Sequence, residues 1–383
     1  MKLGIVWDNK VNRWVLQRFE PLKNNIDITV FVGERNNYDV KSVDLNKVQL
    51  THAEEVSLAI RNPSTVYKRI LRAPYKRMDF YYFSLQKYLK GTDVVYSCDI
   101  TRSAYTLASL KDKLGFKLFL SWWENIPYRA IFDEKTGYHK RHIMEKVDIF
   151  LPFTETAKKV LLLEGVPEEK MRVIYPGVDL KRFKPGPKPE DLLAENNIPI
   201  NSFVILYVGK LVSWKGVYNL VYTARILKER GIKDFVVAVA GRGAQRENME
   251  RLIKETKVEG NFRFLNFASY DEMPDIYRMA DVFVLPSYPT MTWQEQFGMV
   301  LIEAMACGKP VISTNSGSIP EVVGDAGILI SSGNFFQLAE IVVNLMSNRG
   351  FALEMGNRGR QRVETYFDAQ RNALKFYDIC KAI

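Results

Sequence analysis

Two glutamates in the C-terminal part of the chain stand at a spacing that could bind a ligand. Glu295 and Glu303 bracket a Phe-Gly pair and an apolar run in the segment WQEQFGMVLIEAMACGKP, residues 293–310. If a helix begins near Phe297, Glu303 lies inside it and Glu295 lies in the loop just before it. Free N–H groups and the dipole at a helix N-terminus favour an anion. The spacing predicts a site for a ligand with hydroxyl groups on both sides of a phosphate, such as a nucleotide-sugar.

The surroundings of Glu303 decide between a binding role and a merely solvated side chain. Glutamates eight residues apart on a helix are usually both solvated. Glu303, however, lies within the segment MVLIEAMACG, where its neighbours are almost all apolar. A buried charge is costly unless it binds something, so this context favours a binding role for Glu303.

Two lysines follow an expected strand in the segment VGKLVSWKG, residues 208–216. Glycine lets a ligand approach the backbone, and an ammonium group neutralises phosphate. Lys210 and Lys215 are therefore candidate phosphate ligands. The alternative is two solvated lysines on a surface turn, and the segment alone does not separate the two interpretations.

A second glycine-rich segment, AGRGAQ, follows the next expected strand at residues 240–245. It supplies Gly241 and Arg242, but a lone G-x-G is a weak signal that more often marks a turn. A third strand end, STNSGSIPE at residues 313–321, places Gly317 and Ser318 just before a proline that suits a helix start.

Aromatic and amide side chains gather after a strand in the first half of the chain. The segment SWWENIPY, residues 121–128, contains Trp122, Trp123, Glu124 and Asn125. Aromatic faces and amides suit a sugar or a lipid-linked sugar as acceptor. Core tryptophans with a satisfied glutamate are the alternative.

The alternation of short apolar strands with amphipathic stretches predicts an α/β protein with two doubly wound domains. A chain of 383 residues is too long for one ordinary core. The segment RVIYPGVDLKRFKPGPKP, residues 172–189, holds four prolines and marks a junction between the halves. We expect domains over residues 1–175 and 176–367, with a last helix over 368–383 that packs back on the first. Ligands in such folds bind at the carboxyl ends of the strands, here most simply in a cleft that the two domains face.

The net charge of +10 is unevenly distributed. Residues 1–175 hold 29 Lys and Arg against 21 Asp and Glu, whereas the remainder holds 25 against 23. Within residues 61–90, eight basic residues alternate with aromatic ones and with a single acid, Asp79. This pattern suits an anionic membrane surface or nucleic acid, and a solvated helix pair is the third possibility.

Cysteines and histidines favour neither a disulfide framework nor a metal site. The three cysteines lie far apart, and only three histidines are present. This usage suggests a reducing compartment. The apolar run at the N-terminus is short and indicates a first strand instead of a signal peptide. We therefore expect a cytoplasmic protein. Peripheral binding to the inner face of the membrane is an additional hypothesis.

The succession of these motifs resembles the retaining glycosyltransferases of family four (glycosyl transferases group 1), which have the GT-B fold. The resemblance runs from about Phe150 to Phe367. It rests on PGVDLKRF, VGKLVSWKG, AGRG, FLNFASYDEMPDIYRMADVFVLPS, the two glutamates with seven residues between them, and NSGSIPEVV. The first half matches in architecture alone.

The resemblance implies roles for individual residues. It implies catalytic roles for Lys215, Lys210 and Glu295, and Glu124 occupies the region where the family often has a histidine. Glu303 falls at the position that binds the ribose hydroxyls, and Glu295 at the one that holds the donor sugar. The implied donor-binding residues are Gly209, Lys210, Lys215, Gly241, Arg242, Asn266, Phe267, Met273, Glu295, Phe297, Gly298, Met299, Val300 and Glu303. The acceptor-side candidates are Trp122, Trp123, Glu124 and Asn125.

The implied activity is transfer of a sugar with retention from a nucleotide-sugar, UDP in preference to GDP, to a glycan or lipid-linked acceptor. No metal or other cofactor is expected, and no nucleic-acid partner. Two departures from the family lie in the first half: the first strand is followed by WDNKVNRW without a glycine pair, and SWWENIPY has no histidine. A GT-B epimerase of nucleotide-sugars and a non-catalytic nucleotide or nucleic-acid binder are the alternatives.

Overall fold

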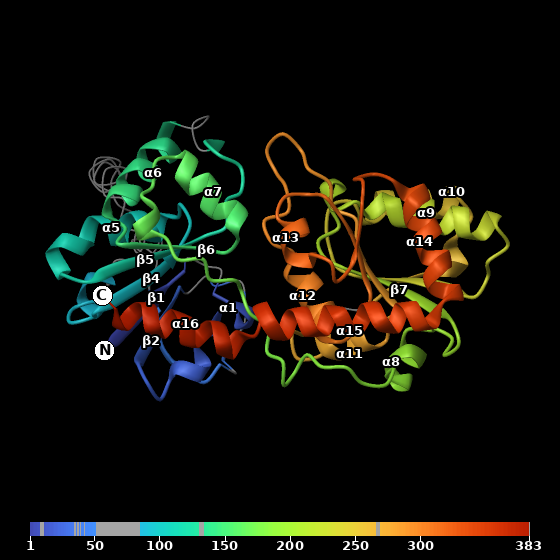
Figure 1. Ribbon diagram of the computed structural model, residues 1–383, viewed down its shortest axis with the longest axis horizontal. Helices are drawn as coiled ribbons and strands as arrows, with labels where there is room; N and C mark the ends of the chain where they lie inside the picture. The colour runs from blue at the N-terminus through green and yellow to red at the C-terminus, as the bar shows by residue number, and fades with distance from the viewer. Residues whose placement is uncertain are drawn as a thin grey trace, which may run out of the picture. The chain divides into compact units, whose positions relative to one another are not determined.

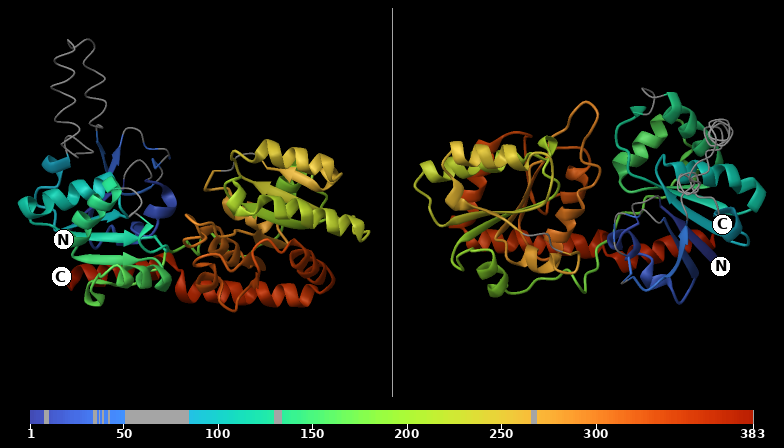
Figure 2. Two further views of the ribbon diagram at one scale, coloured as in Figure 1. Left: turned by 90° about the horizontal axis from the view of Figure 1, so that it is seen from above. Right: turned by 180° about the vertical axis from the view of Figure 1, so that it is seen from behind.

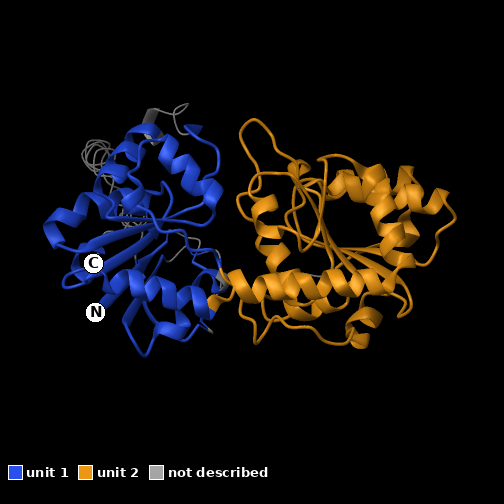
Figure 3. Ribbon diagram, viewed as in Figure 1, with its two compact units in different colours: residues 1–176, 370–383 blue, residues 177–369 orange. Residues whose placement is uncertain are grey.

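The computed structural model describes most of the chain, apart from several short segments and one long one. The described residues are 1–7, 11–33, 36, 38, 40–41, 43–50, 85–129, 134–265 and 269–382. Residues 61–84 of the basic segment 61–90 lie outside them. The chain divides into two compact units, residues 1–176 with 370–383 and residues 177–369 (Figure 3).

Unit 1 is built on a six-stranded sheet in the order β3-β2-β1-β4-β5-β6, in which neighbouring strands are parallel. The strands are β1 (Lys2–Val6), β2 (Asp27–Gly33), β3 (Asn46–Leu50), β4 (Val94–Cys98), β5 (Lys117–Trp122) and β6 (Ile149–Pro152). All residues of β4 and β6 are buried, as expected for apolar runs covered on both faces. Strand β3 was not predicted, because it lies at the sheet edge and most of its residues are polar and partly exposed.

The helices of unit 1 connect these strands. They are α1 (Arg13–Leu16), α4 (Leu85–Tyr88), α5 (Arg102–Leu114), α6 (Glu134–Lys146), α7 (Glu155–Leu163) and α16 (Ala369–Lys381), with the 3-10 turns η2 (Glu20–Leu22) and η4 (Glu168–Lys170). Helix α5 shows how the sequence sets such bounds. The Thr101 side chain accepts a hydrogen bond from Ala104 N at its start, and Gly115 ends it with φ +77°.

Helix α16 belongs to the core of unit 1, although unit 2 precedes it in the chain. The Phe376 ring makes edge contacts with Phe19, Tyr96 and Phe119, at centroid distances of 5.3, 5.8 and 6.1 Å. The Asn372 side chain donates to the Tyr175 carbonyl at 3.0 Å. The end of the chain is therefore part of the first unit's packing.

Unit 2 repeats the architecture with the order β12-β11-β10-β7-β8-β9, again with parallel neighbours. The strands are β7 (Phe203–Val208), β8 (Phe235–Ala240), β9 (Phe262–Phe264), β10 (Val282–Leu285), β11 (Val311–Thr314) and β12 (Ile328–Ile330). Most of them are continuous apolar runs, the pattern that predicts buried parallel strands. In both sheets the order reverses between the two central strands, β1 and β4 or β7 and β10. A reversal of this kind opens a ligand-binding crevice at the carboxyl ends of those strands.

Helices cover both faces of the second sheet. They are α8 (Glu190–Glu195), α9 (Val217–Glu229), α10 (Arg246–Glu255), α11 (Met273–Arg278), α12 (Met299–Ala306), α13 (Ile319–Val323), α14 (Phe335–Ser347) and α15 (Arg349–Tyr366), with the turns η5 (Ser213–Lys215) and η6 (Glu259–Asn261). Helices α10 and α14 pack beside α9, and α15 packs beside α12 (Figure 1). In both views of Figure 2, yellow α10 and red α15 lie on opposite sides of this sheet.

Candidate functional site

The loop between β10 and α12 places the first glutamate of the pair at the switch point of unit 2. Glu295 is 7 % exposed, and its carboxylate is held from two sides. The Lys215 Nζ atom lies 2.5 Å from Glu295 Oε2, and Ser287 Oγ donates to the same oxygen at 3.0 Å. A cation and a carboxylate from the two central loops therefore meet here.

The backbone of Glu295 is fixed by the neighbouring loop between β11 and α13. Glu295 N donates to Ser316 Oγ at 3.3 Å, and Ser318 N donates to the Glu295 carbonyl at 2.8 Å. The segment STNSGSIPE thus supports the glutamate. A carboxylate held at both its backbone and its side chain is preorganised for binding.

Gly216 brings Lys215 to this point. Its backbone is left-handed, with φ +72°, and it is the N-cap of α9. A Cβ atom at this position would lie 1.9 Å from the carbonyl oxygen of Pro286, the first residue after β10. Glycine is therefore required here, both for the left-handed backbone and for the close approach to Pro286. This close approach also joins the loop that carries Lys215 to the loop that carries Glu295.

The two glycines of AGRG serve backbone packing. Pairing between β7 and β8 continues past the strand ends, as Gly209 N donates to the Ala240 carbonyl at 3.0 Å. A Cβ atom on Gly241 would lie 1.9 Å from Gly209 O, and one on Gly243 would lie 2.3 Å from Leu211 O. These contacts hold the segment that includes Lys210, whose side chain is exposed at the same edge of the sheet. Arg242 and Lys210 thus lie on adjacent, paired strand ends.

Helix α12 carries the second glutamate. It begins at Met299, after the N-cap Gly298 with φ +87°, so its start lies two residues beyond the predicted Phe297. The N–H groups of the first turn belong to Met299, Val300 and their neighbours. The Phe297 ring is buried and packs edge-on against Phe367, so that residue can offer a ligand its backbone alone.

Glu303 lies inside α12 and is 5 % exposed, which confirms the predicted burial. The Tyr277 hydroxyl donates to Glu303 Oε2 at 2.6 Å. Burial raises the pKa of Glu303 to about 7, although hydrogen bonds from Tyr277 and Tyr270 and the charge of Arg182 oppose the rise. Burial also raises the pKa of Tyr277 well above its usual value, which keeps its hydroxyl protonated as a donor. A carboxyl group in this setting is poised to accept hydrogen bonds from hydroxyl groups of a ligand.

The remaining donor-side candidates fall in two groups. Met273 opens α11, the helix that carries Tyr277, and its side chain is half-buried. Asn266 and Phe267 lie outside the described residues. Tyr277 and Ser287 were not predicted as partners of the glutamates, although both lie in the segment that carries the family resemblance.

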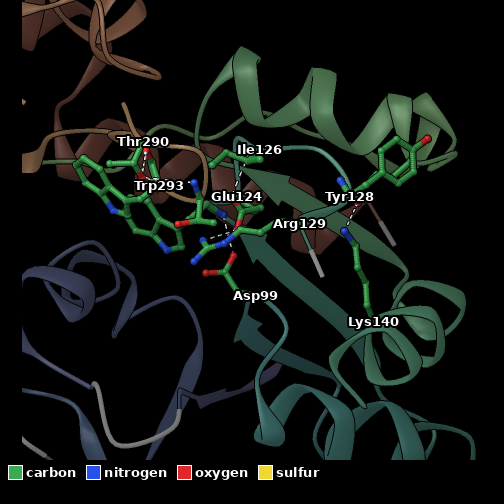
Figure 4. A network of polar contacts seen from close by, with 11 residues as sticks. Asp99, Glu124, Ile126, Tyr128, Arg129, Lys140, Thr290 and Trp293 are labelled. Carbon is green, nitrogen blue, oxygen red and sulfur yellow. Dashed lines mark hydrogen bonds and ion pairs between the residues drawn. The ribbon is translucent and has the colours of Figure 1, made fainter. Parts of the chain in front are cut away.

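In unit 1, Glu124 is engaged in local contacts (Figure 4). Its Oε1 atom accepts from Ile126 N at 3.1 Å, and its Oε2 atom lies 2.9 Å from Arg129 Nη1. Asp99, which follows β4, accepts from Trp123 N at 2.8 Å and has a left-handed backbone with φ +46°. Asp99 stands at the switch point of this sheet and was not among the predicted site residues.

The two tryptophans of SWWENIPY differ in their surroundings. Trp122 is fully buried in the hydrophobic core, edge-on to Phe150, which leaves no face of its indole for an acceptor. Trp123 packs against Phe153 with ring centroids 4.0 Å apart, and Asn125 is also buried. The packing thus does not support an acceptor contact for Trp122.

A buried ion pair fixes the end of the same loop. Glu164 Oε1 accepts from Tyr128 N at 2.7 Å, and Lys140 Nζ lies 2.5 Å from Glu164 Oε2. Figure 4 labels Tyr128 and Lys140 in this network. Tyr128 has φ +57°, so these contacts hold a conformation that a tyrosine rarely adopts.

Within the described residues, no group of three or more His, Cys, Asp or Glu is arranged to hold a metal ion. Among the helices of the same residues, none combines the length and the apolar character that crossing a membrane requires.

Unit 2 is similar in sequence to known proteins. The family described as Glycosyl transferases group 1 matches residues 189–362, which lie within unit 2. A D-inositol 3-phosphate glycosyltransferase of Streptomyces bingchenggensis is 31 % identical over 222 residues, which cover 55 % of this chain and 48 % of that protein. The same-named protein of Corynebacterium jeikeium is 30 % identical over 229 residues, 57 % of this chain and 53 % of its own length. The chain thus spans about half the length of the curated relatives it matches.

Solved structures show the same fold over the whole chain. HepE of Anabaena, solved in complex with UDP, has a TM-score of 0.78 at 17 % identity and full coverage of both chains. Sucrose-phosphate synthase of Thermosynechococcus elongatus has a TM-score of 0.75 at 20 % identity, covering 100 % of this chain and 98 % of that one. The fold is GT-B, as the sequence predicted.

Proposed function

Because residues 189–362 match the family described as Glycosyl transferases group 1, we propose that this chain transfers a sugar from a nucleotide-sugar to an acceptor hydroxyl, with retention of configuration. The observation that carries the proposal is the Lys215–Glu295 pair at the switch point of unit 2, 2.5 Å apart. Lys215 supplies a cation that can bind phosphate, and Glu295 supplies a carboxylate that can accept hydrogen bonds from sugar hydroxyl groups. Buried Glu303, in the adjoining helix, adds a second carboxyl group.

The donor that we propose is a UDP-sugar. HepE of Anabaena was solved with UDP and with UDP-glucose, and it shares the fold of this chain over its full length. The diphosphate would lie between Lys215 and the free N–H groups at the start of α12. Glu303 and the Tyr277 hydroxyl would bind the ribose hydroxyls, and Gly209, Gly241, Arg242 and Met273 would line the rest of the site. GDP is the alternative nucleotide.

Binding of the donor changes the partner of Lys215. In the free protein Glu295 neutralises its ammonium group, and the diphosphate would take over that role. The released carboxylate would then accept hydrogen bonds from the donor sugar and orient it. As the glycosidic bond breaks, Lys215 and exposed Lys210 would stabilise the negative charge on the departing diphosphate, without a metal ion. The acceptor hydroxyl would attack from the face that the diphosphate leaves and would pass its proton to the departing phosphate oxygen, which gives retention.

Calorimetric titration of UDP tests the donor site. We expect Lys215→Ala and Glu303→Ala to lose UDP affinity about tenfold or more, since each removes a charged contact. Lys233→Ala is the matched control, because this exposed lysine lies just before β8, at the opposite edge of the sheet. Equal UDP affinity in all four proteins would refute the assignment. Release of UDP from UDP-sugars, followed with and without acceptors, separates a transferase from an epimerase.

We further propose a glycan or lipid-linked acceptor on the side of unit 1, near Trp123, Glu124 and Asn125. The basic segment 61–90 supports contact with an anionic membrane surface on its cytoplasmic side. Co-sedimentation with anionic vesicles, compared between wild type and a charge-reversed 61–90 segment, tests this contact. Equal co-sedimentation of the two proteins would exclude it.

A further inference from the structure

Two tryptophans from separate loops form an aromatic surface beside the Lys215–Glu295 pair. Trp214 belongs to η5, and Trp293 belongs to the loop between β10 and α12. Their ring centroids are 6.0 Å apart, and the ring planes are inclined by 48°. Trp214 is 37 % exposed. We call these two side chains the tryptophan platform.

Backbone hydrogen bonds hold the platform in place. Tyr288 N donates to the Trp214 carbonyl at 3.0 Å, which ties the two loops together. Thr290 N donates to the Trp293 carbonyl at 2.7 Å, and Trp293 N donates to Thr290 Oγ1 at 3.0 Å (Figure 4). The contact between Gly216 and Pro286 closes the base of the same pair of loops. The rings are therefore presented by a fixed backbone.

The platform adjoins the residues that would hold the donor. Trp214 directly precedes Lys215, and the Lys215 Nζ atom lies 5.1 Å from the centroid of the Trp293 ring. Trp293 stands two residues before Glu295 in the chain. A sugar placed beside this ion pair would thus be within contact of the platform.

On the basis of the proposed function, we propose that the tryptophan platform binds one face of a pyranose ring. Aromatic rings offer a flat apolar surface, and a sugar offers a face of C–H groups with hydroxyl groups at its rim. Hydroxyl and amide side chains flank the rings in the sequence, at Ser213, Thr292 and Gln294. They supply hydrogen-bonding groups of the kind that such a rim requires.

The charge of the loops favours a neutral sugar over a membrane surface. Residues 286–298 contain no lysine or arginine, and their one carboxylate is Glu295. The charge of nearby Lys215 is balanced by that carboxylate. An anionic lipid surface is attracted by clustered basic residues, which the loop that carries Trp293 lacks.

The pyranose ring could come from the donor or from a saccharide acceptor, and two measurements separate these sources. The first is calorimetric titration of UDP and UDP-glucose into wild type, Trp214→Ala and Trp293→Ala. The second is binding of the fluorescently labelled, UDP-saturated proteins to an array of immobilised glycans. Trp214→Phe keeps an aromatic face and should retain most of the binding that Trp214→Ala loses.

Met291→Ala is the matched control, because Met291 is the 97 % exposed side chain at the tip of the same loop. If the donor sugar lies on the platform, both alanine variants should bind UDP-glucose roughly tenfold more weakly while UDP affinity is unchanged. If an acceptor sugar lies there, both nucleotide affinities should be unchanged and glycan signals should fall. The thermal midpoint of each variant checks that it is folded, and Trp214→Phe provides the test if an alanine variant is not.

Two results would overturn the platform proposal. One is unchanged UDP-glucose affinity in the tryptophan variants, together with glycan binding that either is unchanged in them or is absent from wild type as well. The other is co-sedimentation with phosphatidylglycerol vesicles that depends on Trp214 and Trp293, which would assign the platform to a membrane. Wild type that binds neither UDP nor UDP-glucose would instead contradict the proposed function, so the two failures are distinguishable.

Discussion

Glu303 shows how one buried carboxyl group links stability to ligand binding. Its pKa in the folded protein is about 7, against an ordinary value of 4.5, because burial disfavours the charged form. The folded state therefore holds this proton more tightly than the unfolded state. The contribution of Glu303 to the free energy of unfolding is fully present below pH 4.5 and declines as pH rises to about 7.

We expect Glu303→Gln to be more stable than wild type at pH 8, since the glutamine carries no charge to bury. The raised pKa corresponds to a difference of about 3 kcal/mol between the free energies of unfolding of the variant and wild type at pH 8. This difference should shrink as pH falls towards 4.5. Urea denaturation at pH 5, 6, 7 and 8 measures it. Glutamine retains an acceptor for the Tyr277 hydroxyl, so the hydrogen bond is preserved in this comparison.

The same variant should bind UDP more weakly than wild type at pH 8, because a carboxylate is the stronger acceptor for hydroxyl groups. In wild type, UDP affinity should fall as pH drops below 7 and Glu303 becomes protonated. Titrations over the same pH range provide the measurement. A parallel pH dependence in Glu303→Gln would assign the effect to another group.

The Lys215–Glu295 pair is a second buried interaction whose partners depend on each other. The two side chains are 18 % and 9 % exposed. We expect Lys215→Met to lower the free energy of unfolding by about 3 kcal/mol, since it leaves a buried carboxylate without its cation. The double variant Lys215→Met, Glu295→Gln should recover most of that loss. Additive effects in this double-mutant cycle would show that the ion pair contributes little to the stability of the ligand-free protein.

At the scale of structural elements, the start of α9 is tightly constrained, because a backbone contact and a left-handed glycine coincide at Gly216. Gly231, just after the other end of α9, has φ +77° and no atom within 4 Å of a Cβ placed there. We expect Gly231→Ala to cost about 1 kcal/mol for its backbone conformation alone. Gly216→Ala should cost about 3 kcal/mol or more, because the methyl group also meets the Pro286 carbonyl.

Thermal or urea denaturation of the two alanine variants isolates the contact between the loops, since the backbone strain is common to both. UDP affinity should fall in Gly216→Ala alone, because the shift displaces Lys215. Equal stability losses in the two variants would mean that the loops separate without cost.

The secondary structure of unit 2 was largely predictable, because buried parallel strands are continuous apolar runs bounded by glycine, proline and charged residues. Strand β3 of unit 1 was not, since an edge strand with polar residues carries no such run. The start of α12, predicted near Phe297, lies at Met299. The left-handed backbone of Gly298, which sets that start, depends on contacts of the folded chain.

Within the site, the residue types were predictable and their partners were not. The apolar surroundings of Glu303 indicated its burial, yet the Tyr277 hydroxyl comes from another helix. Likewise Lys215 and Glu295 are 80 residues apart, and no local pattern pairs them. The glycines of AGRG are explained by strand-end packing, which only the three-dimensional arrangement reveals.

At the scale of the whole molecule, the path of the chain makes unit 1 depend on residues that follow unit 2. Unit 2 is continuous over 177–369, whereas unit 1 needs α16 to cover Phe19, Tyr96 and Phe119. The first and last residues of unit 2 lie together, because Val178 pairs with the Phe367–Ala369 segment through two backbone hydrogen bonds. We therefore expect a substitution in the packing of one unit to act mainly on the stability of that unit.

Phe376→Ala should lower the stability of unit 1 by about 4 kcal/mol, because it removes a buried ring from three aromatic contacts. The matched control is Phe336→Ala, whose ring in α14 is exposed. In scanning calorimetry we expect the unit 1 transition to move down in Phe376→Ala while UDP still raises the unit 2 transition, since a ligand stabilises the part that binds it. A UDP-induced shift that disappears in Phe376→Ala would show instead that donor binding needs an intact first unit.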